Sequence, residues 1–254
     1  MSQPAKHFQL PRAPIVEAVI DIDCDYVPGT LVTTFEKPAR EAFKDVYPKF
    51  RAQLIQEHKI DNLSQVDPKH SVQQRIQSLL FPKDDEKQLI QIRTQGFSFN
   101  RLAPYASLDE YLPEIERTWK LFVEITKPVQ VRKVGTRYIN RIMLPMQEGR
   151  LELADYLKVC PQLPDEEKLT FVGFLNHHSA LEAGTNNQVN ILLTSQQAEG
   201  GYLPLIFDIE AFHMGASSPG DWSQIQSQIA SLRSLKNRVF QNTLTEKCLN
   251  LFQQ

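Results

Sequence analysis

The sequence predicts an α+β fold, in which a duplicated antiparallel sheet carries long helices packed on one of its faces. Two observations carry this prediction. Each half of the chain opens with a long alternation of apolar and polar residues, at 15–25 and at 131–142. Each half closes with a strand that runs into an amphipathic helix, at 88–126 and at 203–241. Strands with a single apolar face pair in antiparallel sheets and need helices on that face only.

The repeat divides the 254 residues into three parts. Residues 1–14 contain three prolines and are expected to form an extended N-terminal arm. Residues 15–128 form the first α+β half, which ends at Lys127-Pro128. Residues 129–254 form the second half, and we expect the two halves to share one continuous architecture.

Composition is that of an ordinary globular protein, with 41% hydrophobic and 23% charged residues. A formal net charge of −2 gives no whole-molecule attraction to nucleic acid or to an anionic membrane. The three cysteines, Cys24, Cys160 and Cys248, are widely spaced, which favours a reducing compartment. Because no apolar run approaches the ~20 residues of a membrane span, we expect a cytoplasmic protein without membrane contact.

In the first half, the alternation at 15–25 predicts a strand with one apolar and one mostly acidic face. A helix is expected over 31–47, with Pro38 either kinking it or starting it. Weaker alternation predicts strands at 51–58 and 72–81, and 88–100 is expected to form one strand.

The helix after Ser107 is the clearest element of the chain. Ser107 and Glu110 form a capping box, in which each side chain can bond to the other residue's backbone N–H group. Apolar residues then recur at helical spacing through Thr126 and predict one buried stripe: Leu108, Tyr111, Leu112, Ile115, Trp119, Phe122 and Val123.

In the second half, a strand at 131–144 is followed by a short helix near 151–158. Further strands are expected at 168–181, 188–195 and 203–212, with turns at 184–187 and at Gly200-Gly201. The last helix is expected over 221–241, with a possible continuation to Leu251 after a break near Asn242-Thr243.

A basic row lies on the strand at 131–144. Lys133, Arg137 and Arg141 share one face of this strand, where arginine forks could hold phosphate or carboxylate groups. Alternatively, they pair with acidic residues of neighbouring strands, namely Glu17, Asp21, Asp23, Asp208 or Glu210. We favour internal pairing on a solvated sheet face.

Two further sets of residues are candidates for a site. Glu17 and Asp21 belong to an acidic row that could bind Mg²⁺, as in triphosphate-tunnel enzymes, although the Glu-x-Glu-x-Lys pattern of those enzymes is not matched. Arg101 follows a strand end rich in aromatic residues. The sequence contains no Gly-rich phosphate loop, HExxH, GxSxG or dinucleotide motif. We therefore predict no catalytic residue, metal or cofactor.

Four ordered segments resemble a sporadically distributed family of bacterial proteins of uncharacterised activity. They are Pro14 to Ile22 (P-x-x-E-A-V-x-x-I), Gly96 to Tyr105 (G-F-x-F-x-R-L-x-P-Y), Arg137 to Ile142 (R-Y-I-N-R-I) and Leu235 to Phe240 (L-K-N-x-x-F). The resemblance spans nearly the whole chain and implies no catalytic residue. Its patchy distribution is similar to that of toxin–antitoxin and phage-defence genes. The predicted sheet is similar to the saddle of the TATA-binding and helix-grip folds.

The functional expectation is a non-enzymatic protein-interaction module, such as a toxin-neutralising (antitoxin) or phage-defence subunit that binds a partner protein. The alternative is a nucleotide or nucleic-acid binder, including a metal-dependent enzyme that processes phosphoryl groups, which would use the Arg-rich sheet face. The candidate binding residues are Lys133, Arg137, Arg141, Arg101, Glu17 and Asp21. The oligomeric state is left open.

Overall fold

A computed structural model of the chain describes residues 10–61, 69–162 and 172–253. Over these residues, nine strands form one sheet: β1 (Ile15–Asp25), β2 (Arg51–Asp61), β3 (Lys69–Pro82), β4 (Gln88–Arg93), β5 (Gly96–Leu102), β6 (Gln130–Pro145), β7 (Leu175–Leu181), β8 (Asn187–Ser195) and β9 (Tyr202–Ser217). Their order is β2-β3-β4-β5-β1-β6-β9-β8-β7, and every neighbouring pair is antiparallel. The predicted α+β class with an antiparallel sheet is confirmed.

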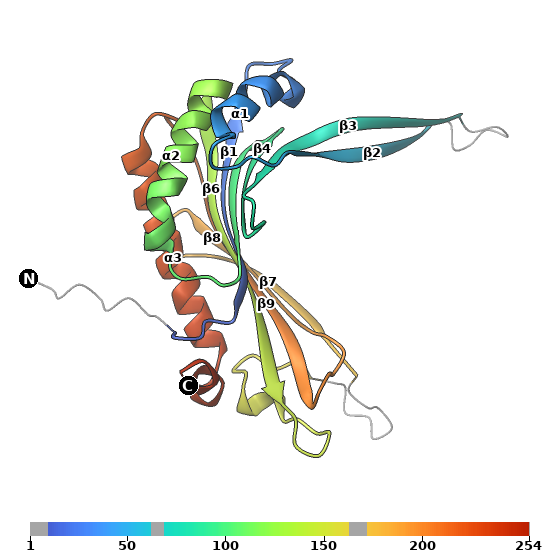
Figure 1. Cartoon of the computed structure of the whole chain (residues 1–254). Coiled ribbons are helices and arrows are strands. Elements are labelled where there is room, and N and C mark those ends of the chain that lie inside the picture. Colours follow the sequence, from blue (N-terminus) through green and yellow to red (C-terminus); the bar gives the residue numbers. More distant parts are fainter. Residues whose placement is uncertain (1–9, 62–68, 163–171, 254) are drawn as a thin grey trace, which may run out of the picture.

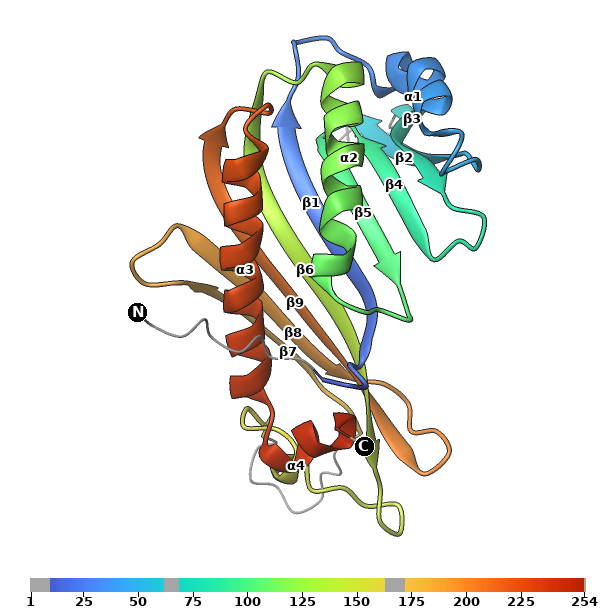
Figure 2. The ribbon, with the colours of Figure 1, turned by 60° about the vertical axis from the view of Figure 1, so that its left-hand side comes forward.

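The long helices of the described residues cover one face of this sheet. α2 (Leu108–Thr126) lies over β1 and β5, and α3 (Trp222–Thr243) lies over β6 and β9 (Figures 1 and 2). The shorter α1 (Glu36–Phe43) and α4 (Glu246–Leu249) lie on the same side, near the two ends of the sheet. Figure 1 also shows the β2–β3 hairpin projecting from the side opposite the helices. We refer to that opposite side as the open face.

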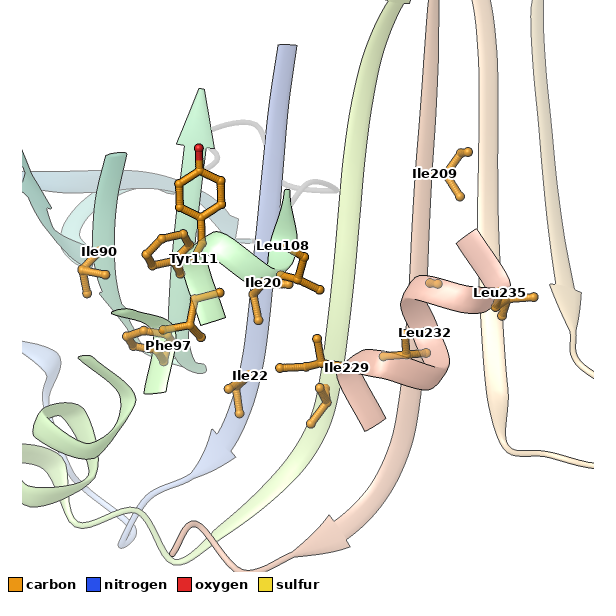
Figure 3. Packing of buried hydrophobic residues seen from close by; sticks show 14 of the residues in the cluster. Ile20, Ile22, Ile90, Phe97, Leu108, Tyr111, Ile209, Ile229, Leu232 and Leu235 are labelled. Carbon is orange, nitrogen blue, oxygen red and sulfur yellow. The ribbon is translucent and has the colours of Figure 1, made fainter. Parts of the chain in front are cut away.

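β1 and β6 lie side by side at the centre, and their alternation explains why one face of the sheet is buried. Ile20 and Ile22 of β1 lie opposite Thr136 and Val134 of β6, and all four side chains are buried toward the helices. The same core contains Phe97 and Tyr111 from the first half and Ile209, Ile229 and Leu232 from the second (Figure 3). The two halves therefore share one sheet and one core.

The predicted helix after Ser107 is confirmed, and the Ser107 half of the expected capping box is formed. The Ser107 Oγ atom accepts a hydrogen bond from the Glu110 backbone N–H group at 3.3 Å. Trp119 is buried against the sheet, stacks on Phe122 with ring centroids 5.1 Å apart, and donates its indole N–H to the carbonyl of Pro219 at 3.0 Å. α2 is therefore tied both to the sheet and to the turn that precedes α3.

One predicted strand is wrong. Residues 88–100 form the hairpin β4–β5 rather than a single strand, because the chain turns at Thr94-Gln95 and continues from Gly96 at φ +143°. A β-carbon at Gly96 would lie only 2.1 Å from the carbonyl oxygen of Ile22, so only glycine allows this approach of β5 to β1. The apolar alternation continues through the turn and conceals it in the sequence.

Several boundaries also differ from expectation. The helix expected at 31–47 is a 3₁₀ turn, Val32–Phe35, followed by α1, and the short helix expected at 151–158 is a 3₁₀ turn, Leu153–Asp155. Residues 168–171 of the strand expected at 168–181 lie outside the described residues, 172–174 are not in a strand, and β7 forms the rest. By contrast, the break expected near Asn242-Thr243 is confirmed: α3 ends at Thr243, and α4 begins at Glu246.

Two further features are the hydrophobicity of the helices and the state of the cysteines. Across the residues with described positions, no helix has both the length and the apolar character of a membrane span.

Cys24, Cys160 and Cys248 are free thiols, and burial raises the pKa of Cys24 and of Cys248 to about 12. At neutral pH these two buried cysteines are therefore protonated side chains of the core.

Candidate functional site

The basic row of β6 lies on the open face and is paired within the chain. The Lys133 ammonium contacts Glu210 of β9 at 2.7 Å. The Arg137 guanidinium grips Asp208 of β9 from Nε at 3.0 Å and from Nη2 at 2.5 Å. This is the internal pairing that the sequence favoured. These contacts raise the pKa of Arg137 and, against the opposing effect of burial, lower the pKa of Glu210.

Arg141 is the most weakly held member of the basic row. Its guanidinium pairs with Glu199 and donates to the side-chain oxygen of Gln196 at 3.3 Å. The side chains of Arg141 and Glu199 are 38% and 55% exposed, whereas that of Asp208 is only 9% exposed. Exposed pairs of this kind contribute little to stability, so Arg141 is the basic residue most able to exchange partners.

The acidic row also finds its partners inside the chain, on the other side of β1. Glu17 accepts a hydrogen bond from Asn100 at 2.8 Å, and Asp21 accepts one from Ser98 at 2.5 Å. Arg93 of β4 contacts Asp23 at 2.8 Å and Asp21 at 3.3 Å. No set of three His, Cys, Asp or Glu side chains in the described part of the chain is arranged to hold a metal ion. The magnesium interpretation of this row therefore gains no geometric support.

Arg101 does not join these residues. Its guanidinium carbon lies 5.4 Å from the ring centroid of Tyr111 on α2, which is on the helix side of the sheet. Its Nη2 atom donates to the carbonyl of Pro104 at 3.2 Å. The structure thus brings Lys133, Arg137 and Arg141 together along β6 and places Arg101 on the opposite face, where it packs the corner between β5 and α2.

A cavity that sequence reasoning missed lies on the helix side. It has a volume of about 570 Å³ and is bounded by residues 10–15, the loop between β5 and α2, β6 and α3. Two cationic residues of α3, Arg233 and Lys236, line it, as do Tyr105 and Tyr138. The two tyrosine hydroxyls are 3.2 Å apart, and burial raises the pKa of both.

The four segments that carry the family resemblance meet at this cavity. The first contributes Pro14 and Ile15, the second Tyr105, the third Tyr138 and Asn140, and the fourth Lys236, Asn237 and Phe240. No periodicity of the sequence relates these four segments to one another. Their shared feature in the sequence is that each contains polar or aromatic residues beside predicted core positions.

No model of a known protein family matches the chain, and a search of curated proteins gives no match. Over the described residues, the protein has a single-sheet α+β fold with a helix-covered face, an open face and a partly open cavity beside α3. Its function has to be argued from these three features.

Removing the best-formed pair of the open face has a predictable cost. We expect Asp208→Asn to lower the free energy of unfolding by about 2 kcal/mol, because Arg137 loses a bidentate partner whose carboxylate is nearly buried. Urea denaturation measures the loss. Glu199→Gln, at the exposed Arg141 pair, is the control and should cost less than about 0.5 kcal/mol. If both variants lose the same free energy of unfolding, the Arg137–Asp208 pair contributes no more stability than the exposed Arg141–Glu199 pair.

Proposed function

We propose that this protein is a non-enzymatic interaction module that binds a partner protein on its open sheet face. The supporting observation is the layout of the sheet. The described helices cover one face, and the charged side chains of the other face remain partly exposed while pairing with one another. Nine strands spaced ~4.8 Å apart give a surface roughly 40 Å wide. A typical protein interface of about 800 Å² per partner fits on such a surface.

The charge of the open face favours a protein partner over a nucleic acid. Lys133 and Arg137 are neutralised by Glu210 and Asp208, and Arg93 is neutralised by Asp23. Phosphate binding depends on cations that are free to replace counterions, and here they would first have to leave these carboxylates. A protein surface that carries both signs of charge can match such a face without breaking the pairs. We expect a flat titration with nucleotides and oligonucleotides at low salt.

The proposal includes the saddle architecture. Strands from the first half extend outward from β1 in the order β5, β4, β3, β2, and those from the second half extend from β6 in the order β9, β8, β7. In each half a long helix, α2 or α3, follows the last strand. We infer that the two halves are duplicated units related as in TATA-binding and helix-grip proteins. By this inference the open face is the inside of a saddle. An antitoxin or phage-defence role remains part of the proposal, on the family resemblance alone.

Arg141 provides the test. We expect Arg141→Glu to weaken partner binding by about tenfold or more. Arginine side chains often contribute a large share of the binding energy of an interface, and a glutamate here would repel the partner group that Arg141 attracts. The measurement is affinity purification of the tagged protein from its native host after nuclease treatment, followed by binding assays with the recovered partner. Arg137 is avoided as the main variant because its loss would strand the nearly buried Asp208.

Arg117→Glu is the matched control. Arg117 lies on α2, is 41% exposed and pairs with Glu114, so it resembles Arg141 in exposure and pairing but lies on the helix side. The proposal requires that this variant binds normally. If Arg141→Glu binds as tightly as wild type, or if only nucleic acid is recovered, the open face is not the protein-binding site.

A further inference from the structure

The cavity beside α3 has a cationic end. Arg233 and Lys236 are three residues apart on α3, so they project from the same side of the helix. Arg233 Nη1 is held by Asp109 at 2.7 Å, and the Arg233 side chain is 13% exposed. Lys236 is different: its ammonium lies 4.0 Å from the ring centroid of Tyr138, and among the described residues it makes no hydrogen bond or ion pair.

An enclosed ammonium without a carboxylate is costly unless something binds it. Lys236 lies over the ring of Tyr138 and shares the cavity lining with Arg233 and Tyr105, and Asp109 is engaged by Arg233. Burial and repulsion by Arg233 lower the pKa of Lys236 to about 7. An anion placed between Lys236 and Arg233 would relieve this repulsion. It could also accept hydrogen bonds from a tyrosine hydroxyl.

Much of the remaining wall of the cavity is apolar. The apolar part includes Leu10, Pro11, Pro14, Ile15, Leu108 and Phe240, which come from the N-terminal segment, the start of β1, α2 and α3. A volume of about 570 Å³ is typical of pockets that enclose a small organic molecule, and such pockets combine apolar walls with a few convergent polar groups. A polymer would not fit, and a bare inorganic ion would leave the apolar wall unused.

We propose that this cavity binds a small organic anion, with its carboxylate or phosphate group on Lys236 and Arg233 and its apolar body against Pro14 and Phe240. The site lies on the helix side of the sheet, so it goes beyond the proposed partner docking on the open face and does not depend on it. Lys236 supplies the charge that selects the ligand. Asn140 is fixed by its own bonds to the carbonyls of Tyr138 at 3.3 Å and Phe207 at 2.9 Å, and it forms part of the cavity wall.

Ligand-observed NMR titration tests the site with defined probes. Benzoate represents carboxylates, phenyl phosphate represents phosphate monoesters, and benzamide is the neutral analogue of benzoate. We expect at least one of the two anions to bind wild-type protein and benzamide not to bind. Inorganic phosphate should bind about tenfold or more weakly than phenyl phosphate, because it lacks the apolar body.

The variant Lys236→Met distinguishes this site from other cationic patches. We expect it to weaken binding of the preferred anion by about tenfold or more. Arg238→Met is the matched control, because Arg238 lies on the same helix, is 50% exposed and pairs with Glu182 away from the cavity. Thermal unfolding confirms that each variant is folded. The proposal is overturned if neither anion binds wild type, or if both variants bind as wild type does.

Discussion

Gly96→Ala is expected to destabilise the protein by roughly 3–5 kcal/mol, which can exceed what a domain of this kind tolerates. Gly96 opens β5 at φ +143°, and a β-carbon there would lie 2.1 Å from the carbonyl oxygen of Ile22 and 2.9 Å from the Cα atom of Asp23. Because both contacts are with backbone of the central strand β1, no side-chain rotation relieves them. The measurement is urea denaturation or, if the variant does not accumulate, the yield of folded protein.

Gly184→Ala separates this collision from ordinary backbone strain. Gly184 also has a positive φ, +78°, but a β-carbon there would meet nothing within 4 Å. We expect a loss of only about 1 kcal/mol, the cost of the left-handed conformation for a residue with a side chain. If the two variants lose the same stability, β5 does not approach β1 as described, and the β4–β5 hairpin would have to be placed differently.

In contrast to the glycine variants, Lys236→Met is expected to stabilise the protein, by roughly 2–4 kcal/mol at pH 7. Each unit by which burial lowers the lysine pKa costs about 1.4 kcal/mol of folding free energy. In the unfolded chain Lys236 has a pKa near 10.5, and in the folded protein burial lowers it to about 7. Between these values the unfolded state binds more protons, so the stability of the wild type falls as the pH is lowered from 10.5 toward 7. Methionine does not titrate and keeps a similar shape.

The stability difference between Lys236→Met and the wild type should depend on pH, because only the wild type has a titrating group at this position. The advantage of Lys236→Met should be largest at and below pH 7 and should vanish as the pH approaches 10.5. Melting temperatures of both proteins at pH 7 and pH 10 measure it. Lys120→Met, at a side chain of α2 that is 65% exposed, should change stability by less than about 0.5 kcal/mol at either pH. A destabilised Lys236→Met protein would mean that the ammonium is satisfied within the fold.

The sequence predicts those helices and strands whose signals, apolar periodicity and capping residues, lie within the element itself. β1, β6, α2 and α3 were predicted within a few residues, because each has one continuous apolar face. The β4–β5 turn was missed because its cause is not local: Gly96 is required by the backbone of β1, more than 70 residues earlier in the chain. Sequence alternation could not show that the apolar run 88–100 folds back on itself.

The candidate site was only partly predictable for the same reason. Lys133 and Arg137 were correctly placed on one face, and their partners Glu210 and Asp208 were among those expected. The partner of Asp21 and Asp23, Arg93, was missed because the strand that contains it was misassigned. The cavity depends on three-dimensional contact between residues 10–15, β6 and α3. No short-range pattern could relate Lys236 to Tyr105 or Pro14.

Site-specific photo-cross-linking in the native host shows which face of the sheet contacts the partner protein. One variant carries the cross-linker at Met214, which lies opposite Lys133 on the open face and is 41% exposed, and the other carries it at Lys120, on the helix side. We expect one protein partner to be captured from Met214 and not from Lys120, and Arg141→Glu to reduce the capture by about tenfold or more. Capture of that partner from Lys120 alone, or of nucleic acid alone from Met214, would contradict this expectation.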